Sequence, residues 1–209
     1  MVKNFLKGWG GTILCMVIAV SAIWLLNAFV FSTVSISGTS MEPNLLNQQR
    51  VGVNHLATLK RGDAVVFDAR QEDPRFKTGN SPYYVKRIIG IPGDTVEYRS
   101  GNLYVNNKKV NQDYISNDEK TQGTEGDFGA TWNLKTLSTT GLWQAKDQNK
   151  STVPSGEYFV MGDHRSVSND GRYFGFVDRN HIMGKVVVPF WYSQQIKNSV
   201  DHQDQHFFA

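Results

Sequence analysis

Hydrophobic residues along the chain form one long uncharged run, followed by many short alternating segments. The run covers residues 11–31, GTILCMVIAVSAIWLLNAFVF, and none of its residues carries a charge. A helix of about 20 residues is about 30 Å long, which matches the hydrocarbon core of a bilayer. The apolar core of a cleaved signal peptide is shorter, usually about 7 to 15 residues. We therefore predict an uncleaved transmembrane anchor over 11–31.

Strand-like segments dominate the chain after this run. Stretches rich in Val, Ile, Tyr and Phe alternate with turn sequences that supply Gly, Pro, Asn and Asp. These stretches are DAVVF, YYVKRIIGI, TVEYR, LYVNN, EYFVMG and KVVVPFWY. The pattern predicts a mostly β fold, with an N-terminal transmembrane helix followed by one β-rich domain over 32–192.

Two regions depart from this alternation. Residues 117–151 are polar and only locally apolar, so we predict an inserted subdomain made of loop with some strand or one short helix. Residues 193–209 are polar apart from their last Phe pair. We predict a solvated and partly disordered C-terminal tail there, as is common at chain ends.

The distribution of charge limits the partners. The net charge is +3, but Lys3 and Lys7 precede the apolar run, which leaves about +1 for everything after it. A nearly neutral domain without a Lys/Arg cluster is a poor binder of polyanions, so we expect no nucleic-acid partner. By the positive-inside tendency, the two lysines predict a short cytoplasmic segment over 1–10 and a domain outside the cell membrane.

Cysteine and histidine usage argues against disulfide and metal chemistry. The single cysteine, Cys15, lies inside the apolar run and can form no intrachain disulfide. The five histidines show neither an HExxH pattern nor a similar metal spacing. We expect no metal and no small-molecule cofactor.

A cluster of small polar residues, SISGTSMEPNLL (35–46), follows the apolar run. Ser40 comes after Gly38 and Thr39, where the backbone can turn sharply and expose amides. Exposed amides beside a nucleophilic oxygen are what an oxyanion hole requires, but a serine hydroxyl also needs a base. The stretch alone fits either a catalytic nucleophile or a flexible linker between anchor and domain.

A lysine in an apolar strand offers such a base. In YYVKRIIGIPGD (83–94), residues Tyr84, Lys86 and Ile88 share one face of a strand, and Arg87 points the other way. Full burial would lower the pKa of Lys86 from about 10.4 by up to about 3 to 5 units. Lys86 is then either a general base or an edge lysine that keeps its amine in water.

A third stretch, MGDHRSVSNDGRYFG (161–175), concentrates Asp, His, Arg and Ser in a loop with several glycines. It fits a hydrogen-bonded platform as well as an exposed loop.

The order of the three stretches is informative. Together they resemble the bacterial type I signal peptidases, membrane-anchored serine proteases with a Ser-Lys dyad. SGTSMEPNL resembles the family's Ser-Met-x-Pro box, RGDAVVF its second strand box, YYVKRIIGIPGD its lysine box and GDHRSVSNDGR its last box.

The resemblance implies an activity and a set of residue roles. The activity is removal of N-terminal signal peptides from secretory precursor proteins by cutting after small residues, with no cofactor. Ser40 is implied to be the nucleophile and Lys86 the general base. The implied supporting residues are Ser168, which orients the lysine, Met41 and Tyr84 beside the dyad, and two structural ion pairs, Asp163 with Arg87 and Asp170 with Arg172.

The sequence departs from the family pattern at two positions. His164 stands where the last box usually has Asn, and Gly38 stands where some members have a Ser or Thr that donates to the oxyanion. An oxyanion hole would then rest on backbone amides, that of Ser40 among them. His164 also raises a competing Ser-His-Asp arrangement with Asp163, although neighbours in a chain rarely point at each other.

Two other functions compete with this interpretation. A self-cleaving repressor of the Ser-Lys type also has Gly-x-Ser-Met followed by a lysine, but it would carry an N-terminal DNA-binding domain or a soluble self-cleavage segment in place of a membrane span. A membrane-tethered β-rich binding module would make the Ser and Lys incidental.

The nine steps from Phe31 to Ser40 span at most about 30 Å, so Ser40 would act at the membrane surface. The expected partners are secretory precursors and, through 11–31, the lipid bilayer.

Overall fold

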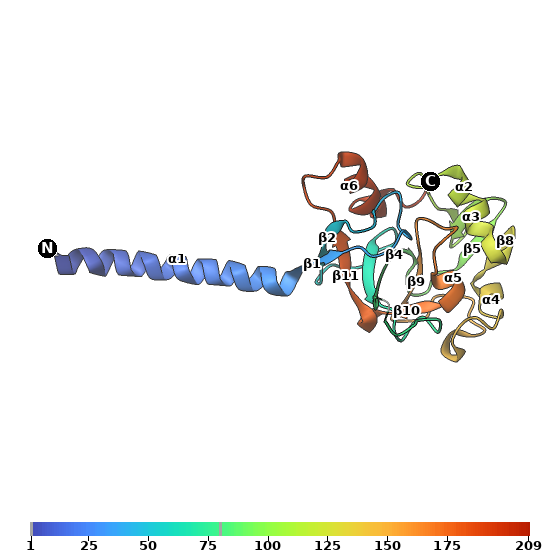
Figure 1. Cartoon of the computed structure of the whole chain (residues 1–209), viewed down its shortest axis with the longest axis horizontal. Helices are drawn as coiled ribbons and strands as arrows, with labels where there is room; N and C mark the ends of the chain where they lie inside the picture. The colour runs from blue at the N-terminus through green and yellow to red at the C-terminus, as the bar shows by residue number, and fades with distance from the viewer. Residues whose placement is uncertain (1, 80) are drawn as a thin grey trace.

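The structure, a computed structural model, describes residues 2–79 and 81–209, apart from the side chains of residues 2–8 and 25–29. Helix α1 (Val2–Val30) extends away from a body built mainly of strands (Figure 1). The body contains two antiparallel sheets. The prediction of a mostly β fold is confirmed.

The larger sheet has seven strands in the order β1-β2-β11-β3-β4-β9-β10. Every neighbouring pair is antiparallel. Chain segments that are far apart in sequence therefore lie side by side, and β4 is held between β3 and β9. The strands are β1 (Phe31–Ser35), β2 (Arg50–Asn54), β3 (Ala64–Asp68), β4 (Tyr83–Gly90), β9 (Glu157–Met161), β10 (Phe176–Asp178) and β11 (Ile182–Val187).

The smaller sheet has four strands in the order β7-β6-β5-β8. These strands are β5 (Val96–Arg99), β6 (Asn102–Val105), β7 (Lys108–Lys109) and β8 (Thr131–Asn133). Ser100 and Gly101 form the turn between β5 and β6 with φ angles of 50° and 73°. Paired positive φ angles suit a two-residue hairpin turn, and glycine adopts them without steric cost.

The region 117–151 contains more helix than we predicted from its sequence. It holds α2 (Asn117–Lys120), α3 (Gln122–Glu125), α4 (Leu134–Leu137), the 3₁₀ helices η1 (Gly126–Phe128) and η2 (Ala145–Asp147), and strand β8. Side-chain caps stabilise these short helices. The side chain of Ser116 accepts a hydrogen bond from the Glu119 amide, and Asn133 forms a reciprocal capping box with Thr136.

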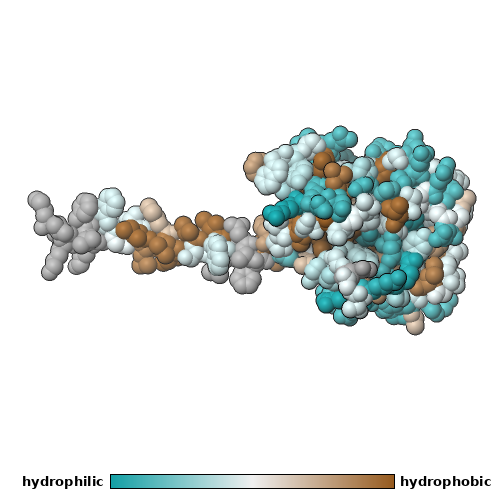
Figure 2. Space-filling view, viewed as in Figure 1, coloured by the Kyte–Doolittle hydropathy of each residue, from teal (hydrophilic) through white to brown (hydrophobic). Residues whose placement is uncertain are grey.

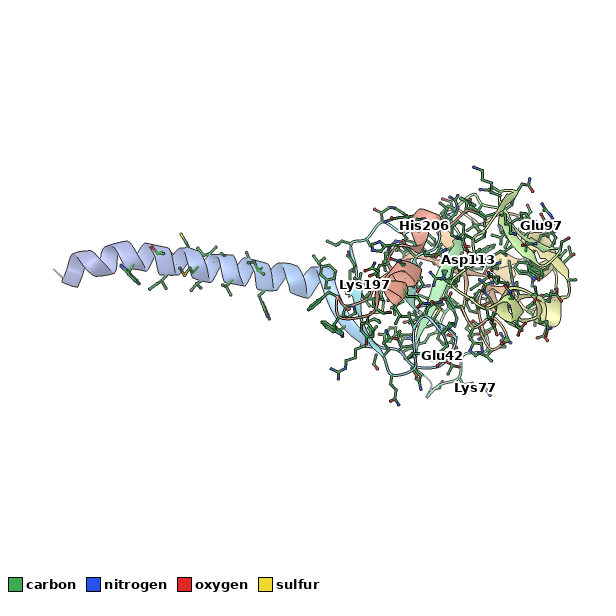
Figure 3. The ribbon with its side chains drawn as sticks, turned by 90° about the horizontal axis from the view of Figure 1, so that it is seen from above. Glu42, Lys77, Glu97, Asp113, Lys197 and His206 are labelled. Atoms are coloured by element: carbon green, nitrogen blue, oxygen red, sulfur yellow. The ribbon has the colours of Figure 1, made fainter. Side chains whose placement is uncertain are left out.

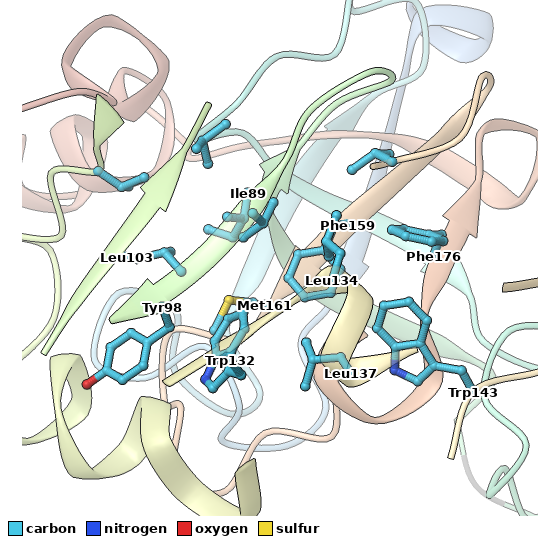
Figure 4. Packing of buried hydrophobic residues seen from close by; sticks show 14 of the residues in the cluster. Ile89, Tyr98, Leu103, Trp132, Leu134, Leu137, Trp143, Phe159, Met161 and Phe176 are labelled. Carbon is cyan, nitrogen blue, oxygen red and sulfur yellow. The ribbon is translucent and has the colours of Figure 1, made fainter. Parts of the chain in front are cut away.

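The same region supplies much of one hydrophobic core. Trp132, Leu134, Leu137 and Trp143 are buried with residues from both sheets (Figure 4). The Trp132 ring stacks on Tyr98 at 5.7 Å, and the Trp143 ring meets Phe176 edge-on at 5.0 Å. Such aromatic pairs add about 0.5 to 1.5 kcal/mol each beyond area burial. The inserted region therefore packs as an integral part of the domain.

The C-terminal segment is folded, so the prediction of a solvated, partly disordered tail is wrong. It forms α6 (Gln194–Val200) and η4 (Gln203–His206), and Figure 3 marks the segment at Lys197 and His206. Val200 is fully buried and Phe207 is only 3% exposed. A few apolar residues spaced along a polar sequence are enough to bury one face of the segment and hold it on the domain.

The described part of α1 presents apolar side chains to its surroundings, seen as brown residues in Figure 2. Between Trp9 and Trp24, its large hydrophobic side chains are 56% to 69% exposed. Among the described residues, no helix combines the length and the apolarity that a membrane crossing needs. Residues 25–29 of the predicted 11–31 anchor lie outside the described side chains, and Phe31 begins β1.

Candidate active site

Ser40 lies in a compact turn between β1 and β2. The Glu42 amide donates to the Thr39 carbonyl at 3.0 Å, and the Leu45 amide donates to the Met41 carbonyl at 2.9 Å. Met41 and Leu45 are buried in a core cluster with β2 and β11 residues. These two side chains fasten the turn to the sheet and leave Ser40 half-buried at its surface.

The amine of Lys86 meets the hydroxyl of Ser40. Lys86 Nζ lies 2.7 Å from Ser40 Oγ in hydrogen-bond geometry, and Lys86 is only 4% exposed. Burial lowers the pKa of Lys86 from its usual 10.5 to about 8, while the nearby Asp170 carboxylate opposes that change. A substantial fraction of Lys86 is therefore uncharged at mildly alkaline pH and able to accept a proton.

Tyr84 lies beside Lys86 on the same face of β4. Its ring centroid is 5.4 Å from Lys86 Nζ, and Phe67 on β3 packs against it edge-on at 5.9 Å. The Tyr84 hydroxyl donates to Asp73 Oδ2 at 3.0 Å. Burial, together with the Asp73 charge, raises the pKa of Tyr84 to about 12. The Tyr84 phenol is therefore uncharged at physiological pH, and its ring forms part of the wall of the site.

A buried ion pair holds the other face of β4. Arg87 donates to both carboxylate oxygens of Asp163, at 2.8 and 2.6 Å, and both side chains have no exposed surface. Asp163 also accepts from Asn44 Nδ2 at 2.9 Å. This network ties the strand that carries Lys86 to the segment 162–170 and to the turn that carries Ser40.

A second buried pair, Asp170 with Arg172, lies at the start of α5 (Gly171–Phe174). Arg172 Nε and Nη2 donate to the two Asp170 oxygens at 2.9 and 3.0 Å. Asp170 also accepts from the Gly162 amide at 3.0 Å, and Arg172 donates to the Gly123 carbonyl at 2.9 Å. The pair therefore connects both ends of the segment 162–170 with the inserted region.

Ser168 is buried beside the dyad, but its hydroxyl has no hydrogen-bond partner among the described residues. The hydrogen bond to Lys86 that its implied role requires is thus not formed here. The Gly162 backbone passes between Ser168 and the Ser40 carbonyl. A Cβ on Gly162 would overlap Ser168 and lie 2.6 Å from Ser40 O, so only glycine fits.

His164 supports the Ser40 backbone and does not contact the Ser40 hydroxyl. Its amide donates to the Ser40 carbonyl at 3.1 Å. Its ring lies with Nδ1 3.3 Å from the Thr39 carbonyl and Nε2 3.8 Å from a Glu119 oxygen. The Asp163 carboxylate faces Arg87 instead. A Ser-His-Asp triad is therefore not assembled.

A pocket of about 250 Å³ opens directly beside the dyad. Its lining includes Ser40, Tyr84, Val85 and Lys86 together with Val167 and Asn169 from the segment 162–170. Asp73 and Asn169 were missed as site residues in the sequence. Both lie in loops, where neither alternation nor the box pattern indicates which way a side chain points.

Comparison with known proteins decides between the interpretations that the sequence left open. The family model described as signal peptidase, peptidase S26, matches residues 9–191. The chain belongs to the signal peptidase family. As a member, it is a serine endopeptidase of the signal peptidase type. The alternatives of a self-cleaving repressor and a β-rich binding module are thereby set aside.

Similar proteins cover nearly the whole chain. Signal peptidase IB of Staphylococcus aureus is 34% identical, over 97% of this chain and 98% of its own length. Signal peptidase I of Bacillus licheniformis is 33% identical, over 94% and 95%. The crystal structure of a signal peptidase I from Enterococcus faecalis is 33% identical and covers 62% of this chain and 97% of its own, with a TM-score of 0.47.

Proposed function

We propose that this signal peptidase is a membrane-bound endopeptidase that removes N-terminal signal peptides from secreted precursors with a Ser40–Lys86 dyad. The observation that carries the proposal is the 2.7 Å approach of the buried Lys86 amine to Ser40 Oγ. A buried, partly neutral amine in contact with a serine hydroxyl is an arrangement that activates a nucleophile.

The chemistry follows from this contact. Neutral Lys86 takes the proton from Ser40 Oγ as the oxygen attacks the scissile carbonyl carbon. The ammonium then returns the proton to the leaving amine as the C–N bond breaks, which leaves an ester on Ser40. In the second step, neutral Lys86 deprotonates a water that attacks this ester. The Lys86 ammonium then protonates Ser40 Oγ as the ester C–O bond breaks, and the signal peptide leaves with a new C-terminal carboxylate.

The backbone amide of Ser40 is our proposed oxyanion donor. It makes no hydrogen bond within the described part of the chain, whereas the Gly38 amide is already bound to Asn47 Oδ1 at 3.0 Å. Gly38 has no side chain to contribute. The Ser40 amide is held in place because its carbonyl accepts the His164 amide, and one such donor is typically worth about 10² to 10³ in turnover.

The other residues implied by the family resemblance act as supports in this proposal. The pairs Asp163–Arg87 and Asp170–Arg172 hold the segment 162–170 against the turn. Met41 anchors the turn, and Tyr84 covers the Lys86 amine. In this proposal Ser168, which is buried against Gly162 next to the Ser40 carbonyl, orients Lys86.

We propose further that the pocket beside Ser40 selects small residues at the −1 and −3 positions of the precursor. Its volume of about 250 Å³ is small, and Tyr84 and Val85 form part of its wall. A misfit of a methylene or more in such a pocket costs about 1 to 3 kcal/mol, or about 10- to 200-fold in specificity.

We also propose that residues 11–31 anchor the chain in the membrane, which agrees with a substrate located at the membrane surface. The exposed apolar side chains of α1 between Trp9 and Trp24 suit a lipid environment, and Lys3 and Lys7 orient the amino terminus to the cytoplasm. From Phe31, Ser40 is within about 30 Å of the bilayer. The cleavage site of a signal peptide emerges from the membrane within that reach.

Cleavage of a secretory precursor by the purified full chain in detergent tests the proposal. Sequencing of the new amino terminus should place the cut after a small residue at the end of the signal peptide. Ser40→Ala should fold and lower turnover by several orders of magnitude. Cleavage by Ser40→Ala at the wild-type rate, or no cleavage by the wild type, would contradict it.

A further inference from the structure

Two adjacent buried carboxylates lie in the segment 69–76, between β3 and β4. Glu72 has no exposed surface and Asp73 is 3% exposed. The Asp73 amide donates to the Ala69 carbonyl at 2.9 Å, and the Phe76 amide donates to the Asp73 carbonyl at 2.9 Å. The backbone around Asp73 is therefore ordered, and its side chain is directed inward at a defined place.

Asp73 joins two walls of the pocket beside Ser40. Its Oδ2 accepts from the Tyr84 hydroxyl at 3.0 Å and from Asn169 Nδ2 at 2.5 Å. Tyr84 lines the pocket from β4, and Asn169 lines it from the segment 162–170. A single carboxylate oxygen thus bridges the strand that carries Lys86 and the segment 162–170.

Further contacts hold Asp73 in place. Its Oδ1 accepts from the Arg75 amide at 2.9 Å. The Arg75 guanidinium also donates to Asn169 Oδ1 and lies 4.5 Å above the Tyr173 ring. The side-chain amide of Asn169 therefore has a hydrogen-bond partner at both its oxygen and its nitrogen, which fixes its orientation at the pocket.

Glu72 ties the same segment to the rest of the domain. Its carboxylate binds Lys146 Nζ at 3.0 Å and the Asp178 amide at 2.7 Å, and lies 2.7 Å from His181 Nδ1. Lys146 belongs to the inserted region, and Asp178 ends β10. Glu72 therefore fixes the segment 69–76 to the inserted region and to β10, while Asp73 connects the same segment to the pocket.

We propose that Asp73 is a positioning residue that sets the width of the pocket beside Ser40, and with it the exclusion of large side chains at the −1 position. This inference rests on the proposed function. Without the shared acceptor, the Tyr84 ring and the Asn169 amide lose the contact that holds them at a fixed separation. The pocket then accommodates bulkier side chains.

Asp73 also acts on Lys86 through its charge. Its carboxylate is one of several that raise the pKa of Lys86 against the larger effect of burial. Replacement by a neutral residue should therefore lower the pKa of Lys86 and move the rising limb of the pH–activity profile to lower pH. A residue that only held the fold together would leave the midpoint of that limb unchanged.

The test compares the full chain with Asp73→Ala, Tyr84→Phe and the double variant, on one precursor carrying Ala or Leu at −1. Asp68→Ala is the matched control, because Asp68 ends β3 and, among the described residues, its carboxylate pairs only with the exposed Arg70. The ratio of kcat/KM for Ala over Leu should fall about tenfold in Asp73→Ala and stay at the wild-type value in Asp68→Ala. The double variant should lose no more than Asp73→Ala, since both act through one contact.

The outcomes separate the inference from the proposed function. Cleavage of neither precursor by the wild type would overturn both. Wild-type cleavage with an unchanged ratio in a folded Asp73→Ala would overturn the inference alone. If Asp73→Ala does not fold, Asp73→Asn keeps the side-chain volume and takes its place. An unchanged ratio in a folded Asp73→Asn would then refute the positioning role.

Discussion

Replacement of Lys86 by Met should stabilise the protein while it removes activity. The folded domain lowers the pKa of Lys86 from 10.5 to about 8, chiefly through burial. At about 1.36 kcal/mol per pKa unit, keeping this lysine in the site costs about 3 kcal/mol of folding free energy at pH 7. Met has a similar length and no charge, so it avoids this cost.

Part of the gain is offset by the lost contact with Ser40. A hydrogen bond of this kind contributes about 1 kcal/mol, and half-buried Ser40 can bond to water instead. The net gain is about 2 kcal/mol, which corresponds to a rise in Tm of about 4 to 8 °C for a protein of this size. Thermal unfolding of the detergent-solubilised full chain at a series of pH values measures it.

The pH dependence has a defined sign. Between about pH 8 and 10.5 the unfolded chain binds the lysine proton and the folded chain does not, so wild-type stability rises with pH in that window. The advantage of Lys86→Met should therefore be full below pH 8 and shrink above it. Exposed Lys77→Met is the control and should change little. A lower Tm for Lys86→Met at pH 7, or a difference that is independent of pH, would refute this reasoning.

Further predictions concern the scaffold and the topology. Asp163→Asn should lower the free energy of unfolding by about 3 to 5 kcal/mol in urea denaturation, because it leaves Arg87 buried without its partner charge. Phe207→Ala should cost about 3 to 5 kcal/mol in the same assay, because the ring is nearly fully buried; a loss below 1 kcal/mol would mean that the C-terminal segment is not docked. Protease added to intact protoplasts should digest an epitope placed after Tyr192 and spare one at the amino terminus, and the reverse pattern would overturn the orientation.

The strands of the catalytic core could be predicted from the sequence because each has a strong local pattern. DAVVF and YYVKRIIGI became β3 and β4, and EYFVMG became β9. The strands β1, β2, β7 and β10 were missed. Phe31 continues an apolar run, which concealed the start of β1, while RVGVN and FVD are too short to stand out from their surroundings.

The parts that depend on tertiary contacts could not be predicted. Phe207 and Val200 lie in a polar sequence, and only the partner surface explains their burial. The short helices of 117–151 are stabilised by caps and by the core around Trp132. At the site, the family boxes indicated Ser40, Lys86 and their neighbours. The role of Asp73 as a shared hydrogen-bond acceptor depends on tertiary contacts with Tyr84 and Asn169, which no local sequence pattern indicates.

The pH dependence of kcat/KM on a secretory precursor tests the central proposal, that Lys86 is the base for Ser40, most directly. Activity should rise along a limb with a midpoint near pH 8, between free histidine and free lysine. His164→Asn should keep this limb, because the amide that supports Ser40 remains, and Lys86→Ala should show no measurable cleavage at any pH. An active Lys86→Ala, or a limb near pH 6.5 that disappears in His164→Asn, would contradict the Ser-Lys mechanism.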